Sequence, residues 1–377
     1  MLPKEANEML TRVGPCTPCG ELLRRFWHPV ALAAEVTEAR PKKRVRILGE
    51  DLVLFRLPSG DGGQVRYGLL DEHCSHRAAS LYYGFVEEDG LRCAYHGWKY
   101  DMNGMCLDQP FEKNPEFKKE VCHRAYPVEK LSGLLFTYMG PRDKKPLLPR
   151  WDFLVRKDWA RKIEVQPVLN CNWLQPMENA VDPSHTRFLH GETFRQKGIR
   201  RNVSYHLKKV DEFVFEPCEW GIRKRRVFEN GEKEVGHILV FPNMLRHPGS
   251  LHFRVPLDDT HTQIYRIVRL NANKGLSGKA LDDLPIEYVM TKNEEGEFNM
   301  DTFPSQDAMA WETQGAITDR SRELLGESDR GITMVRKLLR DQIRIVEQGG
   351  EPMGLVRDPG KNRIIEFVTT EWRGTEE

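Results

Sequence analysis

The sequence predicts an α+β fold in which an all-β domain precedes a second domain, whose antiparallel sheet wraps around a long C-terminal helix in a helix-grip arrangement. From about residue 27 to 141, short apolar runs such as "VRILGEDLVLFRL" are bounded by Gly, Pro and Asp, which is typical of strands and turns. Strand-like runs recur between about 203 and 270, and from Asp307 to about Gln348 the apolar residues follow helical spacing. Strands followed by a long helix indicate packed layers of sheet and helix.

The boundary between the two domains is predicted at "GPRDKKPLLPR", residues 140–150, because this segment is rich in proline and charge. We therefore expect a first domain at 27–141 and a second at 150–377, with residues 1–26 as an N-terminal segment that packs on the second domain. The polar, glycine-containing stretch 271–305 is expected to form a mobile loop that acts as a lid over the second domain.

Charge and hydropathy argue against two classes of partner. The 377 residues include 57 basic and 56 acidic side chains, so the overall charge favours neither a nucleic acid nor a membrane surface. No apolar run is long enough to span a membrane, and the first residues lack the pattern of a signal peptide. We expect a cytoplasmic protein that binds neither nucleic acid nor membrane.

Four metal-binding side chains are grouped in "CSHRAASLYYGFVEEDGLRCAYHGWKYD", which supplies Cys74, His76, Cys93 and His96. These residue types suit either zinc or an iron–sulfur cluster. Zinc sites usually place cysteines in one loop and histidines in the other, whereas each loop here carries one of each. The mixture favours a two-iron cluster in which the cysteines hold one iron and the histidines hold the other. Two neutral imidazoles in place of two thiolates raise the reduction potential of such a cluster.

A second group of polar side chains lies in "ENAVDPSHTRFLH", which supplies Asp182, His185 and His190. The two histidines are five positions apart, about 140° around an ideal α-helix, so they converge only if the helix is irregular or the side chains reach far. Pro183 gives a reason for such irregularity. Two histidines and one carboxylate on one face of an octahedron are the ligands with which non-haem ferrous iron activates O2.

The carboxylate of this second group is expected to be Asp307, in "PSQDAMAWETQG", because it lies at the start of the terminal helix and after the polar loop. Asp301, Glu312 and Asp319 are alternatives. All four acidic residues also have a purely structural explanation, since a negative charge near a helix N-terminus interacts favourably with the helix dipole.

With these motifs in place, the chain resembles the oxygenase (α) subunit of Rieske non-haem iron oxygenases, in the phthalate-dioxygenase-like branch. The resemblance covers nearly the whole chain and rests on "GELLRRFWHPVAL", "CSHRAASL", "CAYHGWKYD", "NWLQPMENAVDPSHTRFLH" and "QDAMAWETQGAITDRSRELLGESDRGI". One departure is Ala78, where the family commonly has glycine after His-Arg. This departure matters for cluster binding only if the position requires a positive φ.

The resemblance implies a reaction and its cofactors. A partner reductase with flavin and iron–sulfur groups, or a ferredoxin, would pass NAD(P)H electrons to one [2Fe–2S] Rieske cluster per subunit, held by the first motif. One ferrous iron per subunit, held by His185, His190 and Asp307, would activate O2 beside a small aromatic substrate. The expected reaction is ring hydroxylation by a mono- or dioxygenase, or oxidative O- or N-demethylation, in aromatic compound catabolism. A Rieske-type electron carrier, or a scaffold without turnover, is the alternative.

The resemblance also implies a catalytic role for Asp182, which in the family bridges a cluster histidine of one subunit to an iron-ligand histidine of the next. Such borrowing requires a closed head-to-tail ring, so we expect a homotrimer or stacked trimers. The substrate is expected to carry a carboxylate. One of Arg246, His247, Arg254 and Arg266, which alternate with apolar residues on strand-like runs, could bind it.

Overall fold

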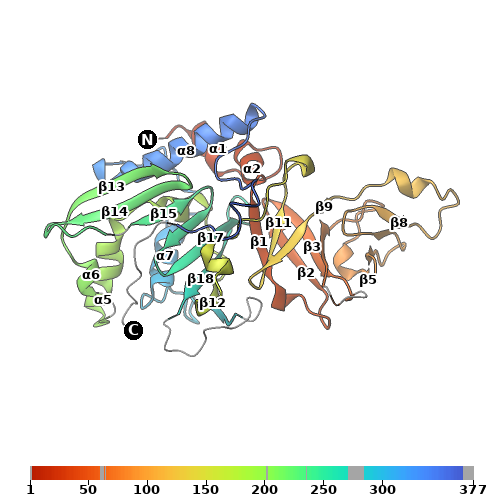
Figure 1. Cartoon of the computed structure of the whole chain (residues 1–377), viewed down its shortest axis with the longest axis horizontal. Helices are drawn as coiled ribbons and strands as arrows, with labels where there is room; N and C mark the ends of the chain where they lie inside the picture. Colours follow the sequence, from red (N-terminus) through yellow and green to blue (C-terminus); the bar gives the residue numbers. More distant parts are fainter. Residues whose placement is uncertain are drawn as a thin grey trace. The chain divides into compact units, whose positions relative to one another are not determined.

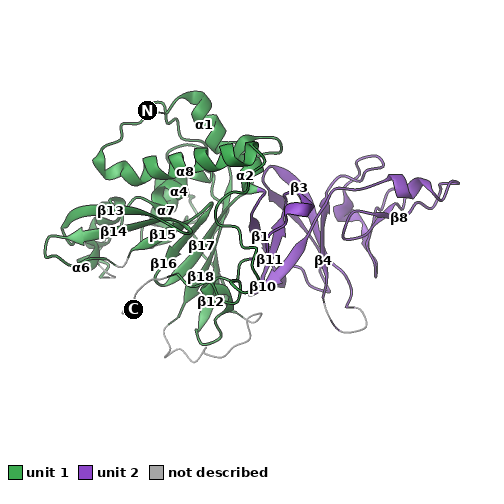
Figure 2. Cartoon of the chain, turned by 45° about the horizontal axis from the view of Figure 1, so that its top comes forward, with its two compact units in different colours: residues 1–23, 149–377 green, residues 24–148 purple. Residues whose placement is uncertain are grey.

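The computed structural model describes residues 2–59, 63, 65–200, 203–234, 236–270 and 284–367. The chain forms two compact units (Figure 2). Unit 2 contains residues 24–148, and unit 1 combines residues 1–23 with residues 149–377. The second unit boundary therefore falls inside the predicted connector. Within the described ranges, no helix is long and apolar enough to cross a membrane.

Unit 2 is built from three small antiparallel sheets (Figure 1). The first sheet contains, in order, β1 (Trp27–Leu32), β11 (Leu134–Tyr138) and β10 (Val128–Leu131). The second contains β2 (Lys42–Ile47), β3 (Glu50–Arg56), β4 (Tyr67–Asp71) and β9 (Ala125–Tyr126). The third contains β5 (Phe85–Val86), β6 (Leu91–Arg92), β7 (Lys99–Tyr100) and β8 (Cys106–Asp108). The short helices of this unit are η1 (Ala33–Glu35), η2 (Leu81–Tyr83), η3 (Phe117–Glu120) and η4 (Arg142–Lys144). The prediction of an all-β first domain is confirmed.

The core of unit 2 contains the two cysteines of the first metal motif. Cys74 follows β4 and Cys93 follows β6, and both cysteines are only 3% exposed. They share one hydrophobic cluster with Val53, Phe55, Leu57, Leu70, Leu81, Leu91, Trp98, Tyr100 and Cys106. Apolar surface removed from water on all sides fixes the two loops against each other.

Unit 1 contains one eight-stranded sheet. In sheet order its strands are β13 (Val210–Cys218), β14 (Gly221–Phe228), β15 (His237–Val240), β16 (Met244–His247), β17 (Ser250–Pro256), β18 (Thr262–Arg269), β12 (Arg161–Val165) and β19 (Ile286–Tyr288). Strands β13 to β18 form an antiparallel meander, β12 pairs with β18 in antiparallel orientation, and β12 pairs with β19 in parallel.

The register of this sheet decides which residues share a face, because side chains alternate along a strand. His252 lies opposite Arg266, and Arg254 lies opposite Ile264. Ile264 packs in one hydrophobic cluster with Ala308 and Trp311, both on a helix, so we call this side of the sheet its inner face. By the same register the inner face also carries Lys224, His237, Leu239, Leu245 and His247.

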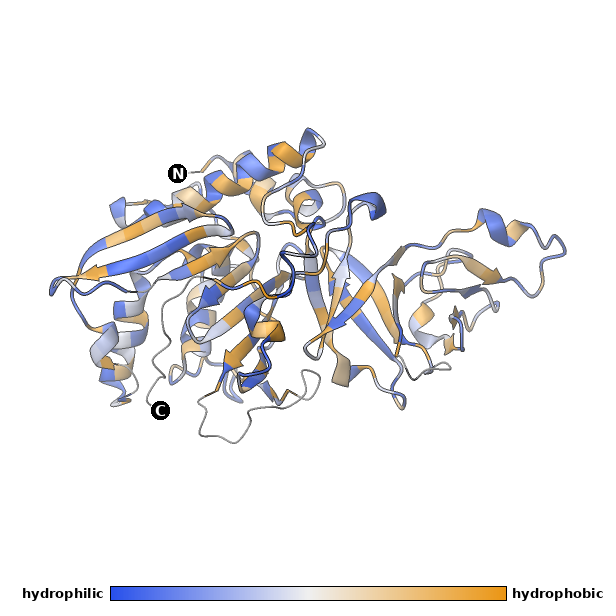
Figure 3. Ribbon diagram, in the orientation of Figure 1, coloured by the Kyte–Doolittle hydropathy of each residue, from blue (hydrophilic) through white to orange (hydrophobic). Residues whose placement is uncertain are grey.

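The helices of unit 1 are α1 (Lys4–Thr11), α2 (Pro18–Leu23), α3 (Asp152–Val155), α4 (Leu174–Ala180), η5 (Thr186–Glu192), α5 (Thr193–Gln196), α6 (Val203–His206), α7 (Phe303–Glu312), η7 (Glu327–Asp329) and α8 (Arg330–Glu347). Apolar and polar colours alternate along α8 in Figure 3. Its buried apolar residues, Val335, Leu339, Ile343 and Val346, recur at helical spacing, and α8 contacts α1, α2 and α4.

The terminal helix is shorter than the sequence predicts. Helical spacing is expected from Asp307 to Gln348, but the structure has two helices, α7 and α8, separated by irregular chain. Shortly after α7, Gly315 adopts a φ of 92°, a conformation that continues no helix. Of the expected lid, residues 271–283 lie outside the described residues, and the remainder includes β19, which pairs with β12.

Candidate metal centres

The two loops of the first motif share one backbone design. In each loop the cysteine N–H donates to the carbonyl oxygen five residues later, at 3.0 Å from Cys74 and 2.8 Å from Cys93. In return, the N–H four residues after the cysteine donates to the cysteine carbonyl oxygen, at 2.8 Å in the first loop and 3.0 Å in the second. That fourth residue has a positive φ in both loops, 56° at Ala78 and 76° at Gly97. The position of Ala78 therefore does require positive φ, which costs a non-glycine residue about 1–2 kcal/mol.

The two imidazoles of the first motif lie next to each other in an edge-to-face arrangement. The ring centroids of His76 and His96 are 4.5 Å apart, and His76 stacks on Trp98 at 4.5 Å with an angle of 7° between the rings. Nδ1 of His76 is buried and has no hydrogen-bond partner among the described residues. Because an unpaired buried ring nitrogen is costly, this atom fits a metal ligand.

The two thiols of the first motif also favour a bound cation. Burial raises the pKa of the Cys74 thiol, and the neighbouring Cys93 adds to that effect. The Tyr100 hydroxyl, 3.2 Å from Cys74 Sγ, counteracts it. Two adjacent buried thiolates are stable together only when a metal binds them. The donor set of the first motif, two thiolates and two imidazoles, thus fits a [2Fe–2S] cluster.

The two histidines of the second motif are aligned by a π-helical turn. Element η5 begins directly after His185 and contains His190. Hydrogen bonds in a π-helix join residues five apart, so residues at this spacing lie about one turn apart on the same side. The ring centroids of His185 and His190 are accordingly 5.2 Å apart. The irregularity that the sequence predicted for this helix is therefore present, as a π-helical turn.

Each of these histidines has its Nδ1 atom engaged by an acceptor. Nδ1 of His185 lies 3.2 Å from Oδ2 of Asp182, and Nδ1 of His190 lies 2.7 Å from Oε1 of Gln306. These oxygens only accept, so Nδ1 carries the proton and Nε2 presents its lone pair. Burial lowers the pKa of His190, although Asp307 opposes the shift, so the neutral ring that metals require is favoured.

Asp307 completes the group from α7. Its Oδ1 atom lies 3.5 Å from Nε2 of His190, is buried, and has no hydrogen-bond partner in the described part of the chain. The candidate ligand atoms of His185, His190 and Asp307 all lie within 4.8 Å of one another. A buried carboxylate oxygen without a donor is costly, and a divalent cation between these atoms would remove that cost.

The alternative carboxylates have other partners. Asp301 pairs with Lys197 at 2.6 Å, and Glu312 pairs with Lys292 at 2.7 Å. Asp319 is exposed and accepts hydrogen bonds from the residue two positions later. Among the described residues, none of the three joins the two histidines in a metal-binding group.

Both carboxylate oxygens of Asp182 have hydrogen-bond partners, Oδ1 in Ser184 and Oδ2 in His185. Its Oδ1 accepts the backbone N–H of Ser184 at 2.7 Å, and Lys224 donates to its carbonyl oxygen at 3.0 Å. Burial opposes ionisation, but the hydrogen bond from His185, together with Ser184 and Lys224, holds the pKa of Asp182 well below its usual range. The side chain is 19% exposed, so this carboxylate is ionised and accessible to a further donor.

Two residues at the second site were not identified from the sequence. Gln306 orients His190 through a hydrogen bond. In the sequence, the only indication of this role was its position next to Asp307. Lys224 reaches Asp182 from β14, and no local pattern marks it.

The four basic candidates for a substrate carboxylate lie in different surroundings. Arg246 points to the outer face and pairs with Asp152 at 3.1 Å. Arg254 lies 5.2 Å above the ring of Trp311 and donates to a backbone carbonyl. Arg266 and His247 lie on the inner face.

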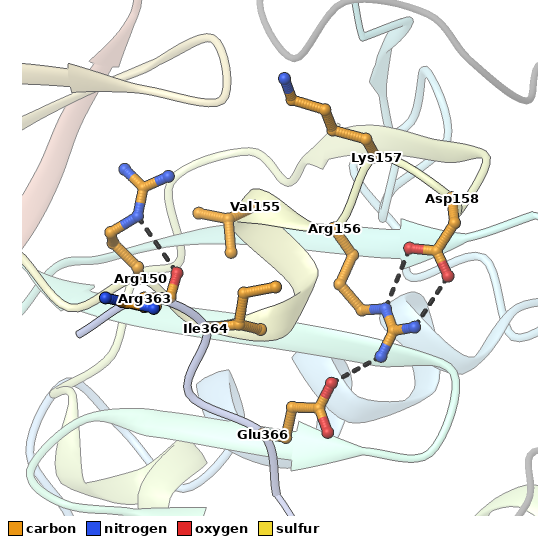
Figure 4. A pocket seen from close by; sticks show the side chains of 8 residues that line it. All are labelled: Arg150, Val155, Arg156, Lys157, Asp158, Arg363, Ile364 and Glu366. Atoms are coloured by element: carbon orange, nitrogen blue, oxygen red, sulfur yellow. Dashed lines mark hydrogen bonds and ion pairs between the residues drawn. The ribbon is translucent and has the colours of Figure 1, made fainter. Parts of the chain in front are cut away.

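A surface hollow of about 460 Å³ in unit 1 is separate from these centres (Figure 4). It is lined by Arg150, Val155, Arg156, Lys157, Asp158, Arg363, Ile364 and Glu366. Arg156 is saturated by Asp158 at 2.8 Å and by Glu366 at 2.6 Å. Since neither metal motif contributes to its lining, the hollow is not part of the site.

Comparisons with known proteins agree with this geometry. A family model for the Rieske [2Fe-2S] domain matches residues 26–130, and one described as LigXa C-terminal domain like matches residues 288–374. The chain is 37% identical to the 5,5'-dehydrodivanillate O-demethylase oxygenase subunit of Sphingobium sp. (strain NBRC 103272 / SYK-6), over 98% of this chain and 87% of that protein. It is 38% identical to the phenoxybenzoate dioxygenase subunit alpha of Ectopseudomonas oleovorans, over 94% and 88% of the two chains. The phthalate 4,5-dioxygenase oxygenase subunit of Pseudomonas putida is 32% identical, over 97% and 92%.

Solved structures show the same architecture. NdmA of Pseudomonas putida CBB5 superposes with a TM-score of 0.61 at 21% identity, covering 88% of this chain and 94% of that one. The fold and the two metal groups define a class of protein that joins a Rieske domain to a catalytic domain with a large sheet and a C-terminal helix. The chain belongs to the family of Rieske non-haem iron oxygenases, as an oxygenase α subunit. The predicted class of enzyme is confirmed.

Proposed function

We propose that the four side chains of the first motif hold the Rieske cluster, and that His185, His190 and Asp307 hold one ferrous iron. The observation that carries the second assignment is the buried Oδ1 of Asp307. Among the described residues it has no donor, and it lies beside two imidazoles that present unprotonated Nε2 atoms. Iron bound there would supply the activation of O2, using electrons delivered through the cluster.

The substrate we propose is an aromatic carboxylate, which is hydroxylated or oxidatively demethylated at oxygen or nitrogen. Dehydrodivanillate, phenoxybenzoate and phthalate, in the names of three relatives, are all aromatic carboxylates. One of these relatives is named an O-demethylase and two are named dioxygenases, so their names support either reaction on an aromatic acid.

Two residues of the chain orient the iron ligands in this proposal. Asp182 and Gln306 accept the Nδ1 protons of His185 and His190, which fixes both ring orientations and raises the basicity of the coordinating nitrogens. Asp182 has an additional role. Its partly exposed carboxylate accepts the N–H of a cluster histidine in a neighbouring subunit, and thereby connects the two metal centres.

The partners that we propose follow from this connection. Electrons reach the cluster from NAD(P)H through a separate reductase or ferredoxin. One relative in the solved structures is the oxygenase of carbazole 1,9a-dioxygenase in a ferredoxin complex. Electron transfer from the cluster of one subunit to the iron of the next requires a closed ring of subunits, and we propose that this ring is a homotrimer. None of the eight cysteines, all within the described residues, forms a disulfide, which supports our proposal of a reducing, cytoplasmic location.

The experiment that tests this function is product analysis by mass spectrometry. Purified protein with both metals loaded would be supplied with a reductase, NADH and ¹⁸O2, over a panel of benzoates, phthalates and methoxybenzoates. We expect a hydroxylated or demethylated product, with ¹⁸O in the hydroxylated one. An electron carrier would instead show cluster reduction with no product from any member of the panel, and only the two irons of the cluster per chain.

A further inference from the structure

Two histidines on the inner face of the sheet each have one ring nitrogen held by a donor. The backbone N–H of Gly249 donates to Nδ1 of His247 at 3.3 Å. Nε of Arg266 donates to Nε2 of His252 at 3.3 Å, and the Ser250 hydroxyl oxygen lies 2.7 Å from the same nitrogen. A backbone amide and a guanidinium can only donate. His247 therefore carries its proton on Nε2, and His252 carries its proton on Nδ1.

These two N–H groups remain available for a ligand. Within the described ranges no acceptor is hydrogen-bonded to either of them. Burial lowers the pKa of both rings well below the usual value, so both are neutral, yet both residues remain partly exposed. His237, 4.3 Å from His247 between ring centroids, shows the same combination, with a pKa lowered by burial to about 4. Rings enclosed by protein but reached by solvent are suited to line a ligand site.

The row of histidines leads toward the candidate iron site. Lys224, opposite His237 in the sheet, donates to the carbonyl oxygen of Asp182 at 3.0 Å. His185 is one of the groups that influence the pKa of His237. The inner face also packs on α7, the helix that carries Asp307. The free N–H groups therefore lie on the surface that faces the iron ligands.

The charges around this surface favour an anion once iron is bound. Among the described residues, the basic side chains on the inner face are Lys162, Lys224, Arg226, Arg254 and Arg266. The carboxylates on this face and at the iron site, again among the described residues, are Glu164, Asp182, Glu234, Glu287 and Asp307. These formal charges balance one for one, so ferrous iron adds two positive charges that none of these groups offsets. An anionic ligand would compensate them.

Building on the proposed function, we propose that the inner face binds the carboxylate of the aromatic substrate, with Nε2–H of His247 and Nδ1–H of His252 as its hydrogen-bond donors. Because neighbouring groups hold each ring in one tautomer, the donors are in place before the ligand arrives, and binding requires no proton uptake. Hydrogen bonds from neutral donors to a carboxylate are stronger than those to a neutral carbonyl. The site therefore distinguishes an aromatic acid from its uncharged analogue.

The test is calorimetric binding to the oxidised protein with both metals loaded and without reductase, so that no turnover occurs. The probes are 3-methoxybenzoate and its uncharged analogue 3-methoxybenzamide. The native protein should bind the acid at least about tenfold more tightly than the amide. His247→Phe and His252→Phe should each weaken acid binding about tenfold and change amide binding by less than about threefold. His252→Gln, which keeps an acceptor for Arg266 and an N–H, should retain most of the preference.

His261→Gln is the matched control, because His261 lies in the turn after β17, outside the inner face, and should leave both affinities unchanged. Every variant must retain the cluster absorbance and full iron content. Three results would overturn the proposed site. The native protein could fail to bind the acid, it could bind the two probes with equal affinity, or both phenylalanine variants could keep the native preference for the acid. None of these results concerns turnover, so the oxygenase function is judged separately by the product analysis.

Discussion

At the scale of single residues, the position of each proton defines the candidate iron site. Asp182 and Gln306 each accept an Nδ1 proton, so both histidines present Nε2 toward Asp307. Of the three candidate ligand side chains, Asp307 is the one that no described protein group orients through a hydrogen bond. Its removal should therefore affect the iron and little else.

Asp307→Ala should lose the mononuclear iron and all turnover while the cluster stays intact. We expect iron content to fall from about three to about two per chain, with unchanged cluster absorbance and electron paramagnetic resonance. Asp301→Ala is the control, because Asp301 forms an exposed ion pair with Lys197 and should keep its iron. Full iron content in the Asp307 variant would transfer the role to another carboxylate.

Ala78→Gly should stabilise unit 2. Ala78 has a φ of 56°, which glycine adopts without steric cost, so thermal stability followed by cluster absorbance should rise by about 1 kcal/mol. Gly97→Ala tests the equivalent position in the other loop. It should destabilise by at least as much, since a Cβ there would also lie 3.1 Å from Pro110. A loss of stability in Ala78→Gly would show that the strain argument fails.

Lys224 should make the stability of unit 1 depend on pH. Burial lowers its pKa from 10.5 to about 8, although Asp182 and Glu234 oppose the shift. Between these two pH values the unfolded chain binds more protons than the folded one, so stability rises with pH across this window. At pH 7 the buried charge costs about 3 kcal/mol, partly offset by the hydrogen bond to Asp182.

Lys224→Met should accordingly be more stable than the native protein by about 1–2 kcal/mol at pH 7. This difference should fall by about 2–3 kcal/mol by pH 10, so that the native protein becomes the more stable of the two. Urea unfolding at several pH values measures it. The control is Lys337→Met, whose side chain is 71% exposed and should show no such dependence. An advantage that stays constant with pH would contradict the lowered pKa.

At the scale of elements, two short segments position the candidate iron ligands: one is an irregular helical turn, and the other is the capped start of a helix. The π-helical turn η5 aligns the histidines, and α7 supplies Gln306 at the end of its first turn and Asp307 directly after that turn. This turn starts from Thr302, whose side chain accepts the N–H of Ser305. Because the ligand lies in the first two turns, the cap should affect metal binding as well as helix stability.

Thr302→Val removes the capping oxygen with little change in shape. The loss of an N-cap costs about 1 kcal/mol, so iron affinity, measured by competition with a chelator, should fall up to about fivefold. Thr302→Ser keeps the oxygen and should keep the affinity. An unchanged affinity in the valine variant would show that packing on the sheet, through Ala308 and Trp311, is sufficient to position α7.

At the scale of the whole molecule, the proposed ring makes each site depend on two chains. A subunit that lacks the cluster, His76→Ala, would be co-expressed with one that lacks the iron, His185→Ala. No single chain in this mixture holds both centres. Under transfer between neighbours, about a quarter of the junctions in randomly assembled rings join an intact cluster to an intact iron.

Activity near a quarter of the native value would therefore support transfer between subunits. Under transfer within one chain the mixture must be inactive. Mixed assemblies have to be demonstrated by two different affinity tags, and product formation would be measured on doubly selected material. Complete inactivity of such material would exclude the shared site.

The sequence by itself determined the features that depend on local order. The cluster motif could be read because its ligands lie in two short loops, and its mixed Cys/His pairing selects among metals. Asp182 and His185 could also be related from sequence, since they are three positions apart, and the apolar spacing of α8 predicted that helix. Asp307 was a choice among four carboxylates, and its role as a ligand stays a prediction.

Tertiary structure alone decided the contacts between distant segments. Gln306 meets His190 across 116 positions, and Lys224 meets Asp182 across 42. His247 and His252 share a surface only because the register of the sheet places them on its inner face. A one-residue shift would turn each side chain to the other side of its strand, and the sequence holds no local signal of that register. The physical reason is that sheet pairing and helix packing are set by the burial of the whole core, whereas motifs record only the neighbours along the chain.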